Sequence, residues 1–471
     1  MSTITAAPSE TIAILDPSTG EEVGTIPAGD AAGVEAAVRT ARAAQPDWAR
    51  TPAGDRAVAL KRIATAVRAS ADRLAELNAQ ESGKLVGDAR GGAEAGAGAI
   101  EQYAELGPLH RGRTLHGDPL AHDAMQFEPR GVAAVIVPWN DPVAIAAQGL
   151  AAALVTGNAV VFKPSERAPF CCAALFELFA AELPEGVVTL VQGDARAGRP
   201  LAAHPGVDVV LHTGSIAAGR DIARACAERG AKATLELGGN DAVIVDGDVD
   251  PQWAAEQVAS GAWTNAGQIC VGTERVYVHE AVAEPFLAAL VALGQNLQVG
   301  PATDPATQLG PLVDARHLEA VDAQVAAALA GGARALCGGA PLDGAGSFYP
   351  ATVLVDVADG SEVVRAETFG PVAPVRVVGS FDEALRLAND TEYGLAATAL
   401  TCSQEHAARA LAELKAGTVR INNVWGGAPG GAAHPRGASG QGLGYGPELL
   451  DELTVVKVIH LEPGRPRPVA A

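Results

Sequence analysis

The first half of the chain alternates short apolar runs with longer amphipathic ones. Short apolar runs bounded by turn residues are typical of buried strands, and apolar residues at helical spacing are typical of helices. The predicted strands are 131–138, 158–164, 186–193 and 207–214. The predicted helices are 141–157, 168–184 and 215–230. This alternation favours right-handed crossovers and a parallel sheet with helices on both faces.

A second series of the same kind begins at Asp241, which predicts a second α/β domain. Its predicted strands are 241–245, 273–280, 373–379, 397–400 and 417–423, with helices at 250–267 and 381–390. The glycine-rich segment 425–446 is predicted to be a long loop that returns across the molecule. The β-prone tail 453–463 has no neighbouring strand in the sequence, so we expect it to add to another sheet, for example in a partner subunit.

Composition narrows the class of protein. The formal net charge of −21 argues against nucleic acid or an anionic membrane as a partner, because both carry negative charge. The N-terminus lacks the basic start and apolar core of a signal peptide, and the apolar region 131–162 is interrupted by turn residues, so no membrane span is predicted. Six cysteines at irregular spacing fit neither a disulfide framework nor a zinc site. The simplest reading is a cytoplasmic protein with free thiols.

One of these cysteines stands in a distinctive place. Cys270 follows the small-residue turn of NAGQIC and precedes a predicted strand, with no CxxC partner and no histidine beside it. The other five are interpreted as small buried hydrophobes. By itself Cys270 is either buried packing or a nucleophile.

Polar groups that follow predicted strands each allow two interpretations, because ligands of parallel sheets bind beyond the carboxyl ends of the strands. Lys163 and Glu166 of KPSE form a solvated pair at a helix start or hold the ribose hydroxyls of a nucleotide. HTGS at 212–215 is a helix start or a phosphate contact. Glu236 of ELGG caps a turn or acts as a general base whose pKa is raised in an apolar cleft. Asn140 of PWN makes an Asx turn or donates a hydrogen bond to a ligand.

Taken together, these motifs have a specific order. PWN, KPSE, TGS, ELGG, GQIC and ETFGP follow one another between residues 138 and 371, and the similarity extends from DPSTGE at 16–21 to VVKVI at 455–459. In this the chain resembles the NAD(P)-dependent aldehyde dehydrogenase superfamily. The resemblance implies that Cys270 attacks the aldehyde carbonyl to give a thiohemiacetal, and that Asn140 and the Cys270 backbone N–H stabilise its oxyanion. Hydride loss leaves a thioester, which Glu236 hydrolyses by activating water.

The resemblance also implies a cofactor site and a fold. The cofactor contacts carried over are Trp139, Lys163, Glu166, Gly214, Ser215, Glu367 and Phe369. Glu166 favours NAD, with NADP as the alternative, and no metal is implied. The fold expected is α/β, with a Rossmann-like cofactor domain, a second α/β catalytic domain and a small β oligomerisation element. The expected ranges are 1–110 and 131–240 for the cofactor domain, 241–425 for the catalytic domain, 426–450 for the return loop, and 111–130 with 451–471 for the arm and tail of a homodimer or homotetramer.

The chain departs from the family pattern at several positions. Ile216 replaces the second hydroxyl residue of TGST, and Gly437 and Gly444 stand where the family often has Lys and Glu, which puts a proton relay beyond Glu236 in doubt. Where relatives with hydrophobic substrates carry aromatic residues, this chain has Asp141 and Thr264.

These departures bear on the substrate. The substrate-pocket residues predicted are Asp141, Gln148, Thr264, Ile269 and Val271. They favour a polar or cationic aldehyde, such as an amino-aldehyde, a hydroxy-aldehyde or a semialdehyde. The alternative is that Asp141 only caps the helix that begins at Pro142. Two other functions stay open: a CoA-acylating semialdehyde dehydrogenase, which typically lacks the glutamate at 236, and a catalytically silent binding or structural homologue.

Overall fold

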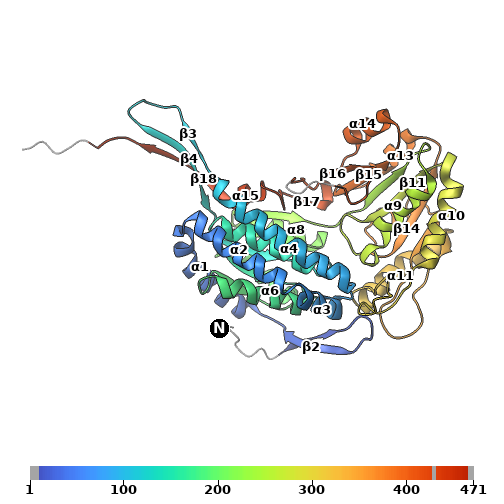
Figure 1. The fold of residues 1–471 in the computed structure, drawn as a ribbon, viewed down its shortest axis with the longest axis horizontal. Helices are drawn as coiled ribbons and strands as arrows, with labels where there is room; N and C mark the ends of the chain where they lie inside the picture. The colour runs from blue at the N-terminus through green and yellow to red at the C-terminus, as the bar shows by residue number, and fades with distance from the viewer. Residues whose placement is uncertain (1–9, 427–430, 465–471) are drawn as a thin grey trace, which may run out of the picture.

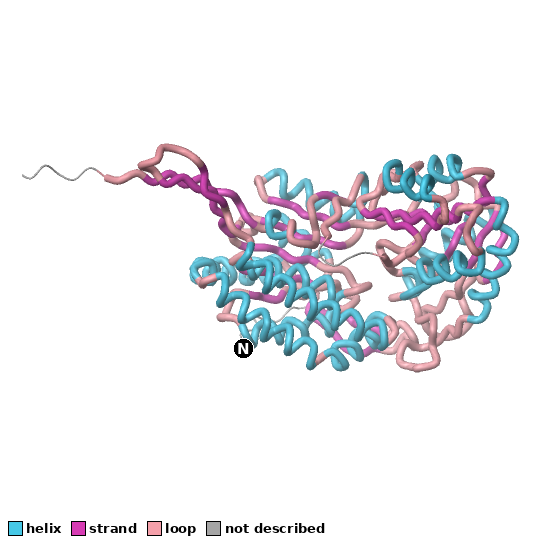
Figure 2. Tube along the Cα trace, turned by 45° about the horizontal axis from the view of Figure 1, so that its top comes forward, coloured by secondary structure: helices cyan, strands magenta, loops and turns pink. Residues whose placement is uncertain are grey.

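The computed structural model describes residues 10–426 and 431–464 as two α/β bodies and a projecting arm (Figures 1 and 2). The first body is built on a six-stranded sheet in the order β17-β9-β8-β5-β6-β7. Its strands are β5 (Val132–Ile136), β6 (Ala159–Lys163), β7 (Val188–Leu190), β8 (Val209–Thr213), β9 (Lys232–Glu236) and β17 (Gly440–Gln441). All run parallel except β17, which is antiparallel to β9. The four strands predicted from the first series are therefore confirmed.

Helices cover both faces of this sheet, which explains why its strands are apolar on both sides. One core packs the sheet against α2 (Ala53–Ala69), α4 (Val86–Leu106), α5 (Pro142–Val155) and α6 (Pro169–Glu182). A separate core packs the other face against α1 (Ala31–Arg50), α7 (Ala195–Ala203) and α8 (Ile216–Glu228). The helix α3 (Ala71–Ser82) precedes α4, and a hairpin of β1 (Thr11–Leu15) and β2 (Glu22–Pro27) precedes α1. The α/β class with crossover helices is confirmed.

The second body has a seven-stranded sheet in the order β12-β13-β14-β11-β10-β15-β16. Its strands are β10 (Asp241–Val245), β11 (Thr273–His279), β12 (Arg334–Cys337), β13 (Thr352–Val355), β14 (Val372–Val378), β15 (Ala396–Leu400) and β16 (Thr418–Ile421). Its helices are α9 (Pro251–Trp263), α10 (Glu280–Asn296), α11 (Ala315–Ala330), α12 (Glu362–Arg365), α13 (Phe381–Ala388) and α14 (Gln404–Glu413). Only β12 is antiparallel to its neighbour. The sequence pattern did not predict β12 and β13.

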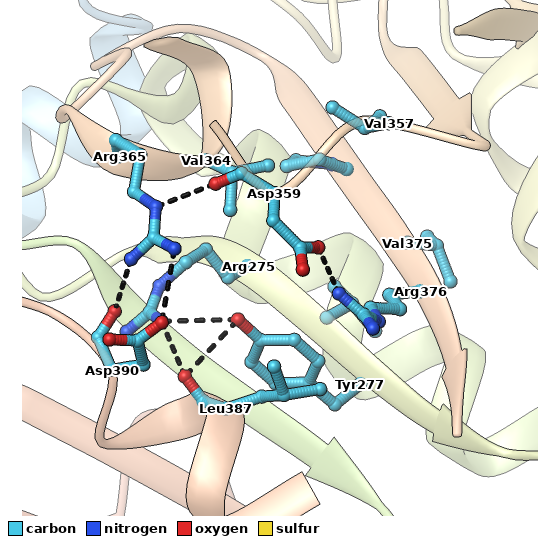
Figure 3. A pocket seen from close by; sticks show the side chains of 12 residues that line it. Arg275, Tyr277, Val357, Asp359, Val364, Arg365, Val375, Arg376, Leu387 and Asp390 are labelled. Carbon is cyan, nitrogen blue, oxygen red and sulfur yellow. Dashed lines mark hydrogen bonds and ion pairs between the residues drawn. The ribbon is translucent and has the colours of Figure 1, made fainter. Parts of the chain in front are cut away.

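A buried arginine ties this sheet to its helices. Arg275 on β11 donates hydrogen bonds to the carbonyl oxygens of Asn240, Leu387 and Ala388, at 2.8 to 3.1 Å, and to the hydroxyl of Tyr277. Arg275, Tyr277 and Leu387 line a hollow (Figure 3) whose volume is about 30 Å³. Every guanidinium in the hollow already has a protein partner, and none of the candidate site residues lines it. We therefore interpret it as structural.

The arm is a three-stranded sheet in the order β18-β4-β3 (Figure 1). Its strands are β3 (Arg113–Leu115), β4 (His122–Pro129) and β18 (Thr454–Leu461). The tail strand β18 pairs antiparallel with β4 over its whole length, from Thr454 opposite Pro129 to Leu461 opposite His122. The tail therefore adds to another sheet, as expected, but the strand it pairs with belongs to its own chain and lies more than 300 residues earlier. The other edge of β18 is unpaired within the described residues.

The segment predicted as a return loop leads back to the first body. Its described part contains a short 3-10 helix at Gly437–Ser439 and the strand β17, which places Gly440 opposite Glu236. The chain then passes through α15 (Leu449–Glu452) to β18. Residues 427–430 of the predicted loop, and residues 1–9 and 465–471 of the predicted domain ranges, lie outside the described residues. None of the helices described is both long and apolar enough to span a bilayer.

Candidate active site

The turn before Cys270 has an unusual backbone. Asn265, Ala266 and Gly267 are three successive residues with positive φ, at 53°, 54° and 73°. Left-handed conformations cost a non-glycine residue about 1–3 kcal/mol each, so the surrounding structure must hold them. A side chain on Gly267 would collide with the carbonyl of Gly370. The turn therefore fixes Cys270 between the end of α9 and the start of β11.

Asn140 of the PWN motif lies against this turn, so the PWN and GQIC motifs meet in the structure. Its side-chain Nδ2 donates to the carbonyl of Gln268 at 3.0 Å, and its own carbonyl accepts from Asn265 Nδ2 at 3.3 Å. Gln268 is itself locked, since its Oε1 accepts from Val313 N at 2.9 Å and its Nε2 donates to Asn265 O at 2.9 Å. The structure thus brings the amide of Asn140 to within two residues of Cys270.

Glu236 lies at the carboxyl end of β9, beside the return loop. Its Oε1 accepts from Gly444 N at 3.2 Å, and a side chain on Gly444 would collide with the Cγ of Glu236. Burial raises the pKa of Glu236 to about 8, opposed only in part by the Gly444 hydrogen bond. The glycine that replaces the family glutamate is therefore required by the place that Glu236 occupies in this chain.

The thiol of Cys270 lies in a poorly solvated place beside three acidic side chains. Cys270 is half-buried, and its carbonyl packs against Gly239, three residues after Glu236. Burial raises the pKa of Cys270 to about 12, with further increases from the carboxylates of Glu367, Asp241 and Glu236. A thiol with this pKa is almost wholly protonated at pH 7, so thiolate formation needs a proton acceptor.

Two residues of ETFGP lie in the same region. Glu367 Oε1 accepts from Gly239 N at 2.9 Å, and burial with the nearby charge of Glu274 raises the pKa of Glu367 to about 8. Phe369 has a left-handed backbone, with φ at 54°, and stands edge-on to Trp139 with ring centroids 5.5 Å apart. Trp139 and Phe369 come from different bodies, so their contact joins the two across the site.

A residue that the sequence analysis missed holds this strained loop. The buried carboxylate of Glu274 accepts from Thr368 N at 2.9 Å and from Phe369 N at 3.0 Å, and burial raises the pKa of Glu274 to about 7. The signal was present in the sequence: TERVYV puts two charged residues side by side in a strand that is otherwise suited to burial. Charges in such a strand need specific partners.

The other predicted cofactor residues lie at the carboxyl edge of the first sheet. Lys163 ends β6 and is 4% exposed, and its Nζ donates to the carbonyl of Pro164 at 2.9 Å. Burial lowers the pKa of Lys163. Glu166 is half-buried three residues further on. Ser215 caps α8 by accepting from Ala218 N at 3.3 Å, and Gly214 N donates to the carbonyl of Glu236 at 3.0 Å.

The structure corrects the alternative interpretation of Asp141 as a helix cap. Asp141 precedes α5 but makes no capping hydrogen bond with its side chain, so the capping interpretation is wrong. Its Oδ1 instead lies 2.8 Å from Nζ of Lys84. Gln148 donates to the carbonyl of Gly444 at 2.9 Å. Thr264, Ile269 and Val271 are half-buried around the Cys270 turn. The sequence did not predict a role for Lys84 in the pocket, because its partner Asp141 lies 57 residues further along the chain.

Among the residues that the structure describes, no group of three or more His, Cys, Asp or Glu side chains could hold a metal ion. The site is instead a thiol, an amide and buried carboxyls collected from both bodies. Such a set can supply a nucleophile, an oxyanion donor and a base for acyl chemistry.

Comparison with known proteins gives a consistent result. The sequence profile of the aldehyde dehydrogenase family matches residues 4–459. A 3,6-anhydro-L-galactose dehydrogenase solved in complex with NAP is 34% identical, with a TM-score of 0.94 and 97% of each chain covered. Lactaldehyde dehydrogenase from Escherichia coli gives the same identity, TM-score and coverage. An NAD-dependent aldehyde dehydrogenase from Sinorhizobium meliloti is 33% identical, with a TM-score of 0.94 and coverage of 99% of this chain and 94% of that one. The chain belongs to the aldehyde dehydrogenase family.

Proposed function

We propose that this protein oxidises an aldehyde to a carboxylic acid, with Cys270 as the nucleophile and a nicotinamide dinucleotide as the oxidant. The observation that carries the proposal is the meeting of Asn140 with the Cys270 turn through the 3.0 Å hydrogen bond to Gln268 O. Attack of the thiolate on the carbonyl carbon creates an oxyanion that needs preorganised donors. The second N–H of the Asn140 amide and the backbone N–H of Cys270 supply them.

Glu236 is proposed to act as the base of this site. It sits at a strand end beside Gly239, which packs against Cys270 O, and its raised pKa keeps most of it protonated at neutral pH. A carboxyl with a pKa near the working pH both accepts and returns protons efficiently. Glu236 is thereby suited to activate the water that cleaves the thioester, which releases acid and the free Cys270 thiol.

The residues at the edge of the first sheet fit a dinucleotide. Among the described residues, the buried ammonium of Lys163 donates only to the carbonyl of Pro164 and pairs with no carboxylate, which leaves N–H groups for ribose hydroxyls. Glu166 beside it disfavours a 2′-phosphate and supports NAD over NADP. The exposed N-terminus of α8 at Ser215 suits a phosphate, and Glu367 suits the nicotinamide ribose. When bound, the dinucleotide supplies the hydride acceptor.

For the substrate we propose a neutral hydroxy-aldehyde. The carboxylate of Asp141 is paired with Lys84, and Gln148 is engaged by Gly444, so the polar pocket side chains offer no unpaired charge of either sign. This favours a neutral polar substrate over the cationic amino-aldehyde that Asp141 alone suggests. The lactaldehyde and anhydrogalactose dehydrogenases named above act, by their names, on oxygen-rich aldehydes, which supports the same class.

We expect removal of Asp141 to alter charge preference in a specific direction. In the wild type, a hydroxy-aldehyde should give a higher kcat/KM than a cationic amino-aldehyde of equal length. Asp141→Ala leaves Lys84 unpaired and should lower kcat/KM for the cationic substrate by about tenfold relative to the neutral one. Asp72→Ala, which breaks an exposed ion pair with Arg90 at 3.3 Å, is the matched control. An unchanged ratio would show that Asp141 does not face the substrate.

The arm is proposed to make the enzyme a homodimer or homotetramer. The unpaired edge of β18 carries exposed apolar side chains, with Val456, Val458 and Leu461 exposed by 49%, 67% and 63%. Exposed edges and apolar patches of this kind are usually covered by a partner. We expect Val458→Asp to lower the molar mass measured by light scattering. Leu411→Asp, which adds a charge at a 59% exposed leucine on α14, should leave the mass unchanged.

A further inference from the structure

The lysine that pairs with Asp141 also reaches the backbone of Asn140. Nζ of Lys84 lies 2.8 Å from Asp141 Oδ1 and 3.4 Å from Asn140 O. The lysine is 8% exposed, so its charge is largely shielded from water and depends on these two acceptors. The ammonium of Lys84 therefore holds both Asn140, the proposed oxyanion residue, and Asp141, which follows it in the chain.

The position of Lys84 is itself rigid. It directly follows the left-handed cap of α3 at Gly83, which is held between two prolines: a side chain on Gly83 would approach Pro311 Cγ to 2.6 Å and Pro17 Cγ to 2.9 Å. A lysine on a mobile loop could not hold another loop in place. Here the backbone directly before Lys84 is held in place by the packing of Gly83 against two prolines.

The neighbouring helix leaves space for the ion pair. On α4, a Cβ at Gly92 would lie 2.6 Å from Asp141 Oδ1 and 3.8 Å from Lys84 Nζ. Glycine inside a helix is destabilising relative to alanine, so its presence here has a local reason. The absent side chain is what allows Asp141 to reach Lys84.

Asn140 is consequently held from two sides. Lys84 Nζ and Asn265 Nδ2 both donate to its carbonyl, and its own amide donates to Gln268 O. We propose that Lys84 is a positioning residue that acts through Asn140, by fixing the peptide whose side chain stabilises the oxyanion on the Cys270 adduct. The inference rests on the proposed function, since it assigns Asn140 the oxyanion.

The test is a double-mutant cycle on kcat/KM with lactaldehyde and NAD, using Lys84→Met, Asn140→Ala and the double variant. Displacing a catalytic group by about 1 Å costs on the order of 100-fold, so Lys84→Met should lose about that factor, mostly in kcat. In the Asn140→Ala background the same change should cost less than about twofold, because its target is gone. Lys84→Arg should restore part of the loss.

Two further measurements separate positioning from folding. The Kd for NAD, measured by quenching of protein fluorescence, should not change in Lys84→Met. Lys232→Met, which removes a lysine paired with Glu452, should retain full activity. If Lys84→Met does not fold, Gly92→Ala perturbs the same ion pair without deleting a charge, and the cycle is run with it. A loss of about 100-fold in both backgrounds would overturn the inference. An inactive wild type would overturn the proposed function instead.

Discussion

Replacement of Cys270 by serine should lower the rate of NADH formation from any aldehyde by at least about 10⁴-fold, the scale on which loss of a nucleophile acts in other enzymes. A serine hydroxyl in this place is far harder to ionise than a thiol, and burial beside Glu367, Asp241 and Glu236 already raises the pKa of the thiol itself to about 12. The rate of NADH appearance, followed by its absorbance, measures the effect.

The control for this variant uses the other thiols. Cys402 is exposed and hydrogen-bonds to Asp248, and Cys337 is half-buried and hydrogen-bonds to Ala351, which are not site residues. Serine at Cys402 or Cys337 should leave the rate of NADH formation within about twofold of the wild-type rate, because substitutions away from a functional site usually have small effects. Cys270→Ser should also keep the Kd for NAD and the Tm of the wild type. Activity that survived in Cys270→Ser, or disappeared in Cys402→Ser, would assign the nucleophile elsewhere.

Much of the fold could be predicted because its strands are buried on both faces. The run at 159–163 is fully buried, and so are those at 132–136 and 241–245, which gives the continuous apolar pattern that a parallel sheet needs. Local turn chemistry marks helix starts in the same way: Ser215 and Asp250 both cap the helices they precede. Local signals of this kind lie within a short stretch of sequence.

The contacts that complete the site were not predictable by the same means. Gly444 reaches Glu236 across 208 residues, and β18 reaches β4 across more than 300. No local pattern marks Lys84 in the sequence, and only the fold shows that it is buried against Asn140. Pairings of this kind depend on topology rather than on periodicity. For Asp141 the local sequence suggests a helix cap, but its side chain instead forms an ion pair with the distant Lys84.

Glu236→Gln should separate the two halves of the reaction. Glutamine keeps the shape of the side chain but cannot take a proton from water, so hydride transfer proceeds and the thioester on Cys270 accumulates. We expect a rapid first burst of NADH close to one equivalent per site, followed by turnover slowed by about 10²–10⁴-fold, the usual contribution of a general base. Rapid mixing with lactaldehyde and NAD measures both phases. Turnover that required CoA and released acyl-CoA in place of the acid would instead favour the acylating branch.

The pH dependence of this variant identifies the titrating group. Because burial raises the pKa of Glu236 to about 8, its basic form is present above that pH, so wild-type turnover should rise as pH increases through about 8. Glu236→Gln should lose this rise of turnover with pH.

The contribution of Glu236 to folding stability changes with pH in the opposite direction. A carboxyl whose pKa is raised on folding contributes stability that is fully present below its unfolded value of about 4.5 and is lost as pH rises through 8. The Tm of Glu236→Gln minus the Tm of the wild type should therefore increase as the pH is raised. Equal loss of burst and turnover would instead place Glu236 in activation of the Cys270 thiol. Parallel Tm curves would assign the titration to another residue.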